Sequence, residues 1–346
     1  MRQALQRLAL FFLLVLLVAP CYAGETFRLT ILHTNDLHGM MEPHLYSNDD
    51  SPFQGPEREL GGLARLATAI RQSRARSDNV VVVDTGDVFT RGPWHRRWYG
   101  EPEIEAMNLI GYDMLVVGNN ELKPIWGDPV SEEMMLSLMR RSRFPWLAAN
   151  LTLGSGPPPG CDSRAFVEGI HPFVVRSFGP VRVGFLGLTT AVTPDYAFLR
   201  GWTVGDPIAT AKQWVAIARR YCDVLIAVTH IGTGTGSELA RQVDGIDAIV
   251  GGHSHTFLSE PLIVKGPSGR DVPMAQAGEL GVVLGVFELE FEKDPEWRLK
   301  QATARLVPID ASYAEDPAVR GLLDRYVKQP APQEGARLPV LFTAGP

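Results

Sequence analysis

Residues 31–39 read ILHTNDLHG, an apolar stretch that gives way to polar residues within a few positions. Phe27 to His33 alternates apolar and polar residues and loses that pattern at Asn35, as a β-strand ending in a loop would. Asp36 and His38 follow directly, two positions apart. A carboxylate and an imidazole at one strand end are suited to binding a metal ion. This stretch therefore predicts a strand that delivers two candidate metal ligands.

Four further segments have the same form, with polar residues directly after β-branched apolar runs. They are VVVDTGD (81–87), VVGNN (116–120), VTHIG (228–232) and IVGGHSH (249–255). In α/β sheets, functional residues gather in loops beyond the carboxyl ends of the strands. The five segments together supply seven candidate metal ligands: Asp36, His38, Asp87, Asn119, His230, His253 and His255.

Apolar periodicity between these segments predicts alternating strands and helices. We expect strands at 27–33, 80–83, 114–117, 181–186, 223–228 and 246–250, and helices at 61–76, 103–110, 132–141, 208–220 and 237–243. Two longer strands, 282–292 and 299–306, are expected to form an antiparallel ending. This order is typical of an α/β fold whose sheets are covered by helices.

The chemistry of these ligands favours a pair of divalent cations. Two metals about 3.5–4 Å apart can clamp a phosphoryl group and share an activated hydroxide. Asp87 is the natural bridging carboxylate, and Gly86 before it lets the backbone approach closely. Carboxylate, imidazole and amide ligands suit Mn, Zn, Fe or Co and do not choose among them. The sequence therefore predicts phosphoester hydrolysis at a two-metal centre.

With these segments, and with AANL (148–151) and VGFLGLTT (183–190), the chain resembles the calcineurin-like metallophosphoesterases. It is most similar to the N-terminal catalytic domain of periplasmic 5′-nucleotidases, from about Phe27 to Leu306. The resemblance implies a four-layered αββα sandwich and a small phosphomonoester substrate, nucleotide-like in kind. It also implies two ligand sets that share Asp87: Asp36, His38, Asp87 and His255 for one metal, and Asp87, Asn119, His230 and His253 for the other.

The segment GNNELK departs from the family pattern at two positions. In the family, a histidine that protonates the leaving oxygen follows the asparagine ligand, and an aspartate three residues further on orients it. Here those positions hold Asn120 and Lys123. A positioned general acid contributes about 10²–10⁴-fold to the rate, and an amide supplies no proton. We therefore expect Asn120 to be a catalytic-site residue that donates a hydrogen bond to a phosphoryl oxygen.

The first 23 residues have the form of a secretory signal peptide. Arg2 and Arg7 flank the apolar stretch Leu8 to Val18, and small residues before Gly24 predict cleavage after Ala23. The stretch is short for a membrane span, which needs about 20 apolar residues, and Pro20 disfavours lipidation of Cys21. We expect a periplasmic or secreted protein without a stable membrane anchor.

The remaining organisation is expected to comprise a metallophosphoesterase domain over 24–310 and a linker-like helix with a flexible tail over 311–346. No C-terminal nucleotide-binding domain is expected. The 346-residue chain has a formal net charge of −6, which offers no electrostatic footprint for nucleic acid. The sequence does not indicate an oligomeric state.

Several features have two interpretations. The basic-aromatic segment Arg91 to Tyr99 is either an exposed loop or a source of phosphate contacts, with His95 as a replacement acid. Gly232, Gly234 and Gly236 predict a flexible connection more readily than a phosphate loop. Cys161 and Cys222 either pair or, for Cys222, fill the core. His33, inside the first strand, is expected to be a buried structural histidine.

Two alternatives to a phosphomonoesterase remain open. One is a metal-loaded binding or accessory protein with weakened catalysis. The other is a thiosulfohydrolase-like esterase that uses the same metals on a non-phosphate ester.

Overall fold

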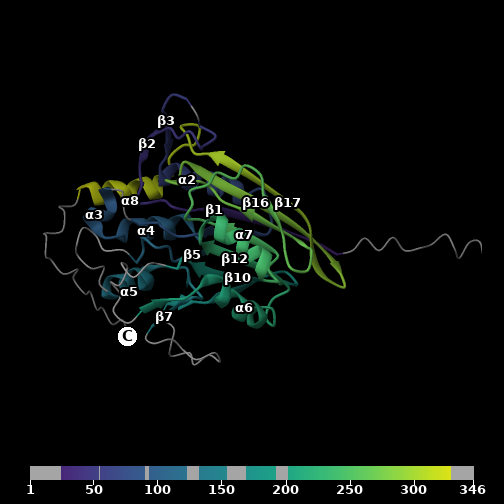
Figure 1. Cartoon of the computed structure of the whole chain (residues 1–346). Helices are drawn as coiled ribbons and strands as arrows, with labels where there is room; N and C mark the ends of the chain where they lie inside the picture. The colour runs from purple at the N-terminus through teal and green to yellow at the C-terminus, as the bar shows by residue number, and fades with distance from the viewer. Residues whose placement is uncertain are drawn as a thin grey trace, which may run out of the picture.

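The computed structural model describes residues 25–53, 55–89, 93–122, 132–153, 169–191 and 202–328. Two mixed β-sheets lie face to face, and helices cover the outer face of each (Figure 1). This is the four-layered αββα sandwich that the sequence predicts. The signal peptide, Cys161, Lys123 and the C-terminal tail lie outside the described residues.

The first sheet has seven strands in the order β17-β16-β1-β4-β5-β6-β8. Five of them run parallel: β1 (Thr26–Thr34), β4 (Val80–Asp84), β5 (Met114–Val116), β6 (Trp146–Leu147) and β8 (Ile170–His171). The long antiparallel hairpin of β16 (Val283–Asp294) and β17 (Glu296–Pro308) extends the sheet beyond β1 (Figure 1). A register shift between Glu290 and Phe291 marks a bulge in this hairpin.

The second sheet has six strands in the order β14-β15-β13-β12-β10-β9. Its parallel strands are β10 (Val181–Thr189), β12 (Val224–His230), β13 (Ala248–Gly251) and β15 (Asp271–Ala275), and its antiparallel edges are β9 (Phe173–Phe178) and β14 (Leu262–Lys265). Two small sheets pair β2 (Pro43–Tyr46) with β3 (Arg58–Gly61), and β7 (Leu151–Leu153) with β11 (Trp202–Val204).

Helices are divided between the two outer faces. The first sheet is covered by α2 (Leu63–Arg74), α3 (Pro93–Trp98), α4 (Glu101–Ile110), α5 (Glu132–Arg141) and α8 (Pro317–Lys328). The second sheet is covered by α6 (Pro207–Ala218) and α7 (Gly232–Gln242). Asp206 caps α6 by accepting a hydrogen bond from the N–H of Ala209, and Pro207 at the first helical position suits this start.

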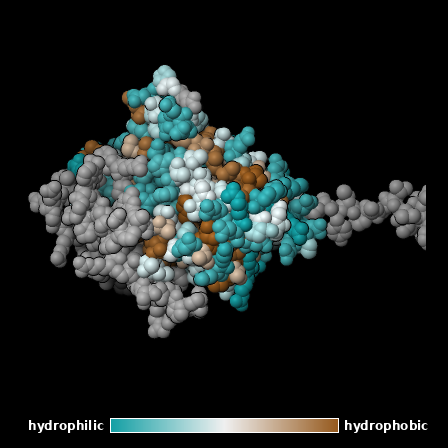
Figure 2. Space-filling model, viewed as in Figure 1, coloured by the Kyte–Doolittle hydropathy of each residue, from teal (hydrophilic) through white to brown (hydrophobic). Residues whose placement is uncertain are grey.

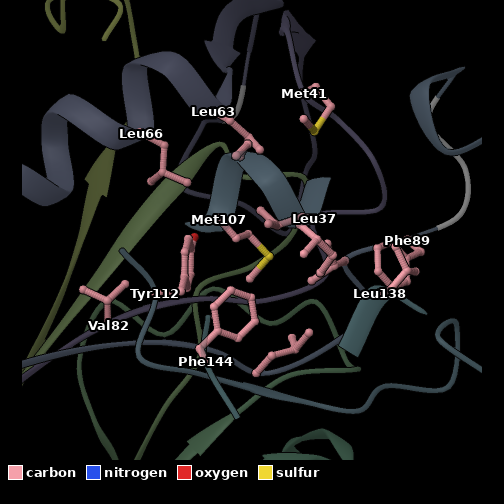
Figure 3. Close-up of a cluster of buried hydrophobic side chains, with 14 of the residues drawn as sticks. Leu37, Met41, Leu63, Leu66, Val82, Phe89, Met107, Tyr112, Leu138 and Phe144 are labelled. Carbon is pink, nitrogen blue, oxygen red and sulfur yellow. The ribbon is translucent and has the colours of Figure 1, made fainter. Parts of the chain in front are cut away.

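The apolar side chains form one core between the two sheets and an outer core between each sheet and its helices. Ile31 and Val83 of the first sheet and Phe185 of the second belong to the core between the sheets. Figure 3 shows part of the outer core, where Val82 and Met107 lie between the sheet and the helices. Alternating directions along a strand divide its side chains between two cores, which is why these strands are apolar on both faces.

The structure corrects two sequence-based expectations. Gly232, Gly234 and Gly236 form the first turns of α7 rather than a flexible connection. The segment around His95 is helical in α3 and the imidazole is only 3% exposed, so it is not an exposed loop. The helix α8, predicted as a linker-like helix, packs on the domain, with Leu322 and Leu323 buried in the outer core beside α2 and α4. The domain boundary at residue 310 stays a prediction.

Cys222 is a free thiol that is 4% exposed and packs in the core beside Gly184, in agreement with the packing interpretation. On the face shown in Figure 2, apolar residues occur in small groups among hydrophilic ones. In the described part of the chain, we find no helix with the length and apolar character needed to cross a membrane.

Candidate metal centre

The carboxyl ends of five parallel strands meet where the two sheets face each other. β1, β4 and β5 arrive from the first sheet, and β12 and β13 from the second. Hydrogen bonds join the two sides: Thr85 Oγ1 donates to the carbonyl of Gly251 over 3.0 Å, and the N–H of His253 donates to Asp36 Oδ2 over 2.9 Å. His230 Nδ1 also lies 2.8 Å from the Thr85 carbonyl. The seven predicted ligands therefore converge on one region.

Six of them form two groups of three. Within each group, the ligand atoms lie within 4.8 Å of one another. We call them the Asp36 group (Asp36, His38 and His255) and the Asp87 group (Asp87, His230 and His253). In the first, His255 Nε2 lies 3.2 Å from Asp36 Oδ1 and 3.3 Å from His38 Nε2. In the second, His230 Nε2 lies 3.3 Å from Asp87 Oδ1.

Asn119 joins the Asp87 group through its side chain. Its Oδ1 lies 3.1 Å from His230 Nε2, and the residue is 5% exposed. A neutral carbonyl oxygen beside an imidazole and a carboxylate completes a mixed oxygen and nitrogen donor set, which suits a borderline divalent cation.

Backbone conformation sets the direction of most of these side chains. Five of the seven candidate ligands have left-handed φ angles: Asp36 (53°), His38 (50°), Asp87 (60°), His253 (80°) and His255 (52°). Such angles are uncommon outside glycine and cost of order 1–3 kcal/mol each. Residues held this way persist only where the surrounding structure compensates, and they cluster at functional sites.

Apolar neighbours anchor the strained loops. Leu37, between two candidate ligands, is 2% exposed in the outer core, and Phe89 is 2% exposed in the same core. Figure 3 shows both side chains among the buried apolar residues. The carbonyl of Phe89 lies 3.4 Å from His38 Nδ1, so the anchored chain also contacts the imidazole. Burial of these side chains offsets part of the backbone strain.

Gly86 allows the loop after β4 to touch the loop after β5. It has a φ of 98°, and a Cβ there would lie 2.7 Å from the N of Gly118 and 2.8 Å from the carbonyl of Val116. Only glycine tolerates both the angle and this approach.

The charges of the centre favour cations. Burial lowers the pKa of His230, but the carboxylate of Asp87 outweighs it and raises the pKa to about 10. Burial likewise lowers the pKa of His255, whereas its interactions with Asp36 and Glu279 raise it to about 9. The acidic groups thus hold protons on two imidazoles, and a divalent cation would replace those protons.

One buried atom supports the fit of a cation directly. Asp36 Oδ1 is buried and accepts no hydrogen bond of normal geometry from the described residues, although His255 Nε2 lies 3.2 Å away. Buried carboxylate oxygens are normally satisfied, and a metal in the Asp36 group would satisfy this one. The residues present therefore fit a divalent cation.

Comparison with known proteins agrees with this geometry. Residues 29–257 match the family described as calcineurin-like phosphoesterase. The chain belongs to this family. Over 320 residues it is 31% identical to the 5′-nucleotidase of Bos taurus, a match that covers 88% of this chain and 53% of the relative. The chain thus spans about half the length of this curated relative.

Solved structures show the same fold for this calcineurin-like phosphoesterase. A 5′-nucleotidase precursor from Thermus thermophilus superposes with a TM-score of 0.73 at 27% identity, covering 87% of this chain and 58% of that one. A calcineurin-like phosphoesterase from Bacillus subtilis, YfkN, superposes with a TM-score of 0.67 at 22% identity, covering 87% and 97%. The second likeness concerns the fold alone.

Two glutamates of this phosphoesterase contact the ligands and were not identified from the sequence. Glu121 directly follows the asparagine pair, and its place beside the predicted ligands was a usable signal. Its carboxylate accepts the N–H of Asp87 over 2.9 Å. Glu279 lies with Oε2 2.8 Å from His255 Nδ1. It follows no recognisable segment, so only the fold reveals its position.

The other histidines lie apart from the two groups. His33 is 1% exposed and its pKa is lowered to about 3 by burial, as expected for a structural histidine. His95 stacks on Phe89 with ring centroids 5.1 Å apart. Burial lowers its pKa to about 4. A neutral imidazole at pH 7 does not fit the role of replacement proton donor. Arg91 lies outside the described residues. Arg97 lies over the Trp98 ring, 4.5 Å from its centroid.

Proposed function

We propose that this phosphoesterase is an exported hydrolase of small, nucleotide-like phosphomonoesters that uses a binuclear centre of divalent cations. The observation that carries the proposal is the pair of three-residue groups at the meeting carboxyl edges of the two sheets. The name 5′-nucleotidase of its relatives supports the substrate class. The predicted signal peptide supports export to the periplasm or beyond.

The proposed ligands are those of the two groups together with Asn119, and Asp87 would be shared by the two positions. When bound, the cations would neutralise phosphate charge and activate water for attack on phosphorus. The protein's own residues hold the ligands at fixed angles through the strained loops. Asn120 would donate to a phosphoryl oxygen, since an amide donates hydrogen bonds without releasing a proton.

Asn120 also restricts which esters react well. Its side-chain amide cannot protonate a leaving oxygen, so the leaving group must depart with little help at that position. Phenolate and phosphate leave as weak bases, whereas a ribose alkoxide does not. The proposed enzyme therefore hydrolyses aryl phosphates and phosphoanhydrides faster than simple nucleoside monophosphates.

A metal-dependent substrate screen tests this function. The purified protein is assayed with Mn²⁺ or Zn²⁺ against nucleoside monophosphates, a nucleoside diphosphate and an aryl phosphate, with bound metal measured in parallel. Phosphate release that requires metal supports the proposal. No release from protein that carries two cations contradicts it and favours the metal-loaded binding protein instead. Sulfate release from a thiosulfate ester identifies the thiosulfohydrolase-like alternative.

A further inference from the structure

Glu121 joins two loops that carry proposed metal ligands. It is 1% exposed, and its carboxylate accepts four backbone N–H groups. Three belong to the loop after β4: Asp87 at 2.9 Å, Val88 at 2.8 Å and Phe89 at 3.3 Å. The fourth belongs to the loop after β5, from Gly118 at 2.6 Å. One buried carboxylate thus ties both loops together.

These four donors need that acceptor. Asp87 has a φ of 60°, so its loop leaves strand geometry at once, and its successive N–H groups point at a common centre. Buried N–H groups left without an acceptor destabilise the folded state. Charge-assisted hydrogen bonds to a carboxylate are stronger than neutral ones. Without this acceptor, the loop that presents Asp87 would lose three of the hydrogen bonds that hold its conformation.

The space around the carboxylate is filled. A Cβ at Gly118 would lie 2.7 Å from Glu121 Oε2 and would collide with the backbone N of Asp87. The two loops therefore approach backbone to backbone, with the carboxylate between them. Asp87 and Asn119, one on each loop, depend on this contact for their relative position.

Glu279 has the matching position at the other group. Its Oε2 lies 2.8 Å from His255 Nδ1, and its side chain is 14% exposed. The opposite ring nitrogen of His255 faces Asp36 Oδ1 at 3.2 Å. A carboxylate on the far nitrogen of a ligating histidine fixes the ring orientation and raises its basicity. Glu279 is therefore placed to orient the Asp36 group and not the Asp87 group.

We propose that Glu121 and Glu279 are positioning residues for the metals. Glu121 acts through Asp87 on the Asp87 group and on the position that shares this ligand, whereas Glu279 acts through His255 on the Asp36 group alone. This inference rests on the proposed binuclear centre. It goes beyond that centre by giving positioning roles to two residues that are not ligands. Each carboxylate acts through a different ligand, and only Glu279 is confined to one group.

Mn²⁺ binding in single-site proteins tests the division. His38→Ala leaves the Asp87 group as the intact site, and His253→Ala leaves the Asp36 group. Calorimetry with Mn²⁺ alone then measures each site with and without Glu121→Gln or Glu279→Gln. Loss of such a partner costs about 10–100-fold in metal affinity. We expect a loss of that size for Glu121→Gln in His38→Ala and for Glu279→Gln in His253→Ala.

The crossed combination decides the claim. In the His38→Ala protein, Glu279→Gln should change Mn²⁺ affinity by less than about threefold, because Glu279 acts through His255, which belongs to the other group. Equal losses from both substitutions at the Asp87 group, or no loss from Glu121→Gln there, would overturn the proposal. The matched control is Glu288→Gln, which makes the same carboxylate-to-amide change at an exposed position on β16. It should leave the Mn²⁺ affinity of both sites unchanged.

Amide exchange in the wild-type protein gives a second measurement if Glu121→Gln fails to fold. The N–H groups of Asp87, Val88, Phe89 and Gly118 should exchange slowly without metal, because Glu121 binds them in the metal-free structure. Fast exchange of these four amides would overturn the proposal. Both measurements are independent of turnover: a two-metal protein without phosphate release would contradict hydrolysis while leaving the positioning roles intact.

Discussion

Asp87 accepts two hydrogen bonds from Asn120. The backbone N–H of Asn120 donates to Oδ1 over 2.7 Å, and the side-chain amide donates to Oδ2. The residue that stands where the family has its proton donor thus contacts the carboxylate proposed to bridge the metals. This contact links the departure from the family to the metal centre, because an amide can hold a carboxylate without changing charge.

Substitution of Asn120 by histidine tests the leaving-group argument. We expect Asn120→His to raise kcat on a nucleoside monophosphate by about 10-fold or more, since a general acid contributes about 10²–10⁴-fold where a poor leaving group needs a proton. On an aryl phosphate the gain should be several-fold smaller. Steady-state kinetics on both substrates measure the difference, and equal effects on the two would refute the argument.

Removing one histidine from each group should remove one metal each. We expect two Mn²⁺ per wild-type chain, and one per chain in both His38→Ala and His253→Ala, because each substitution breaks one three-residue group. Metal analysis after removal of free Mn²⁺ gives the count. Two retained ions in both variants would mean that the groups are not the binding sites.

Gly86 combines a positive φ with a close backbone contact beside the centre. Gly86→Ala should lower the free energy of unfolding by at least about 2 kcal/mol, because its Cβ meets the backbone of the loop after β5 and its φ is positive. Gly269→Ala is the control, with a φ of 79° but open space around the Cβ. It should cost about 1 kcal/mol. Denaturant unfolding compares the two, and similar losses would show that the close approach is unimportant.

Glu103 should make stability depend on pH. It is 1% exposed, and burial raises its pKa to about 8 from an ordinary value of 4.5. The folded state therefore holds a proton that the unfolded state releases, and this contribution is complete below about pH 4.5 and is lost as pH rises through 8. The difference between these two pKa values corresponds to at most about 5 kcal/mol in the free energy of unfolding.

The variant Glu103→Gln stays neutral at every pH, so it should unfold at the same denaturant midpoint as wild type near pH 4 and at a higher midpoint near pH 8.5. Glu288→Gln, on the exposed surface of β16, serves as the control for a lost charge. A wild-type midpoint that falls no faster than that of Glu103→Gln between these pH values would contradict the assignment.

Local patterns in the sequence were sufficient for the order of strands and helices and for placing the ligand candidates at strand ends, and the family resemblance supplied the four-layered fold. Asp36 and His230 lie at ends of apolar strands, and carboxyl ends of parallel strands share an edge of the sheet. The meeting of two such edges required the tertiary structure. Their roles as ligands stay predictions that the metal counts above test.

Long-range packing explains what the sequence did not show. Glu279 reaches His255 only because the chain after β15 returns beside the centre, and no local pattern marks it. The helix α7 begins at Gly232 despite three glycines in its first turns, since Leu239 and Ala240 bury its inner face. Tertiary burial outweighs weak helix propensity there. His95 became buried for a similar reason, because the aromatic residues of α3 pack inward.

Phosphate release from an aryl phosphate, followed while Mn²⁺ is added to chelator-treated protein, tests the central claim most directly. We predict no release without metal and a turnover that rises as the second equivalent of Mn²⁺ binds. A protein that binds two Mn²⁺ ions and releases no phosphate, or one that turns over equally well with chelator present, would contradict the proposed two-metal phosphoesterase.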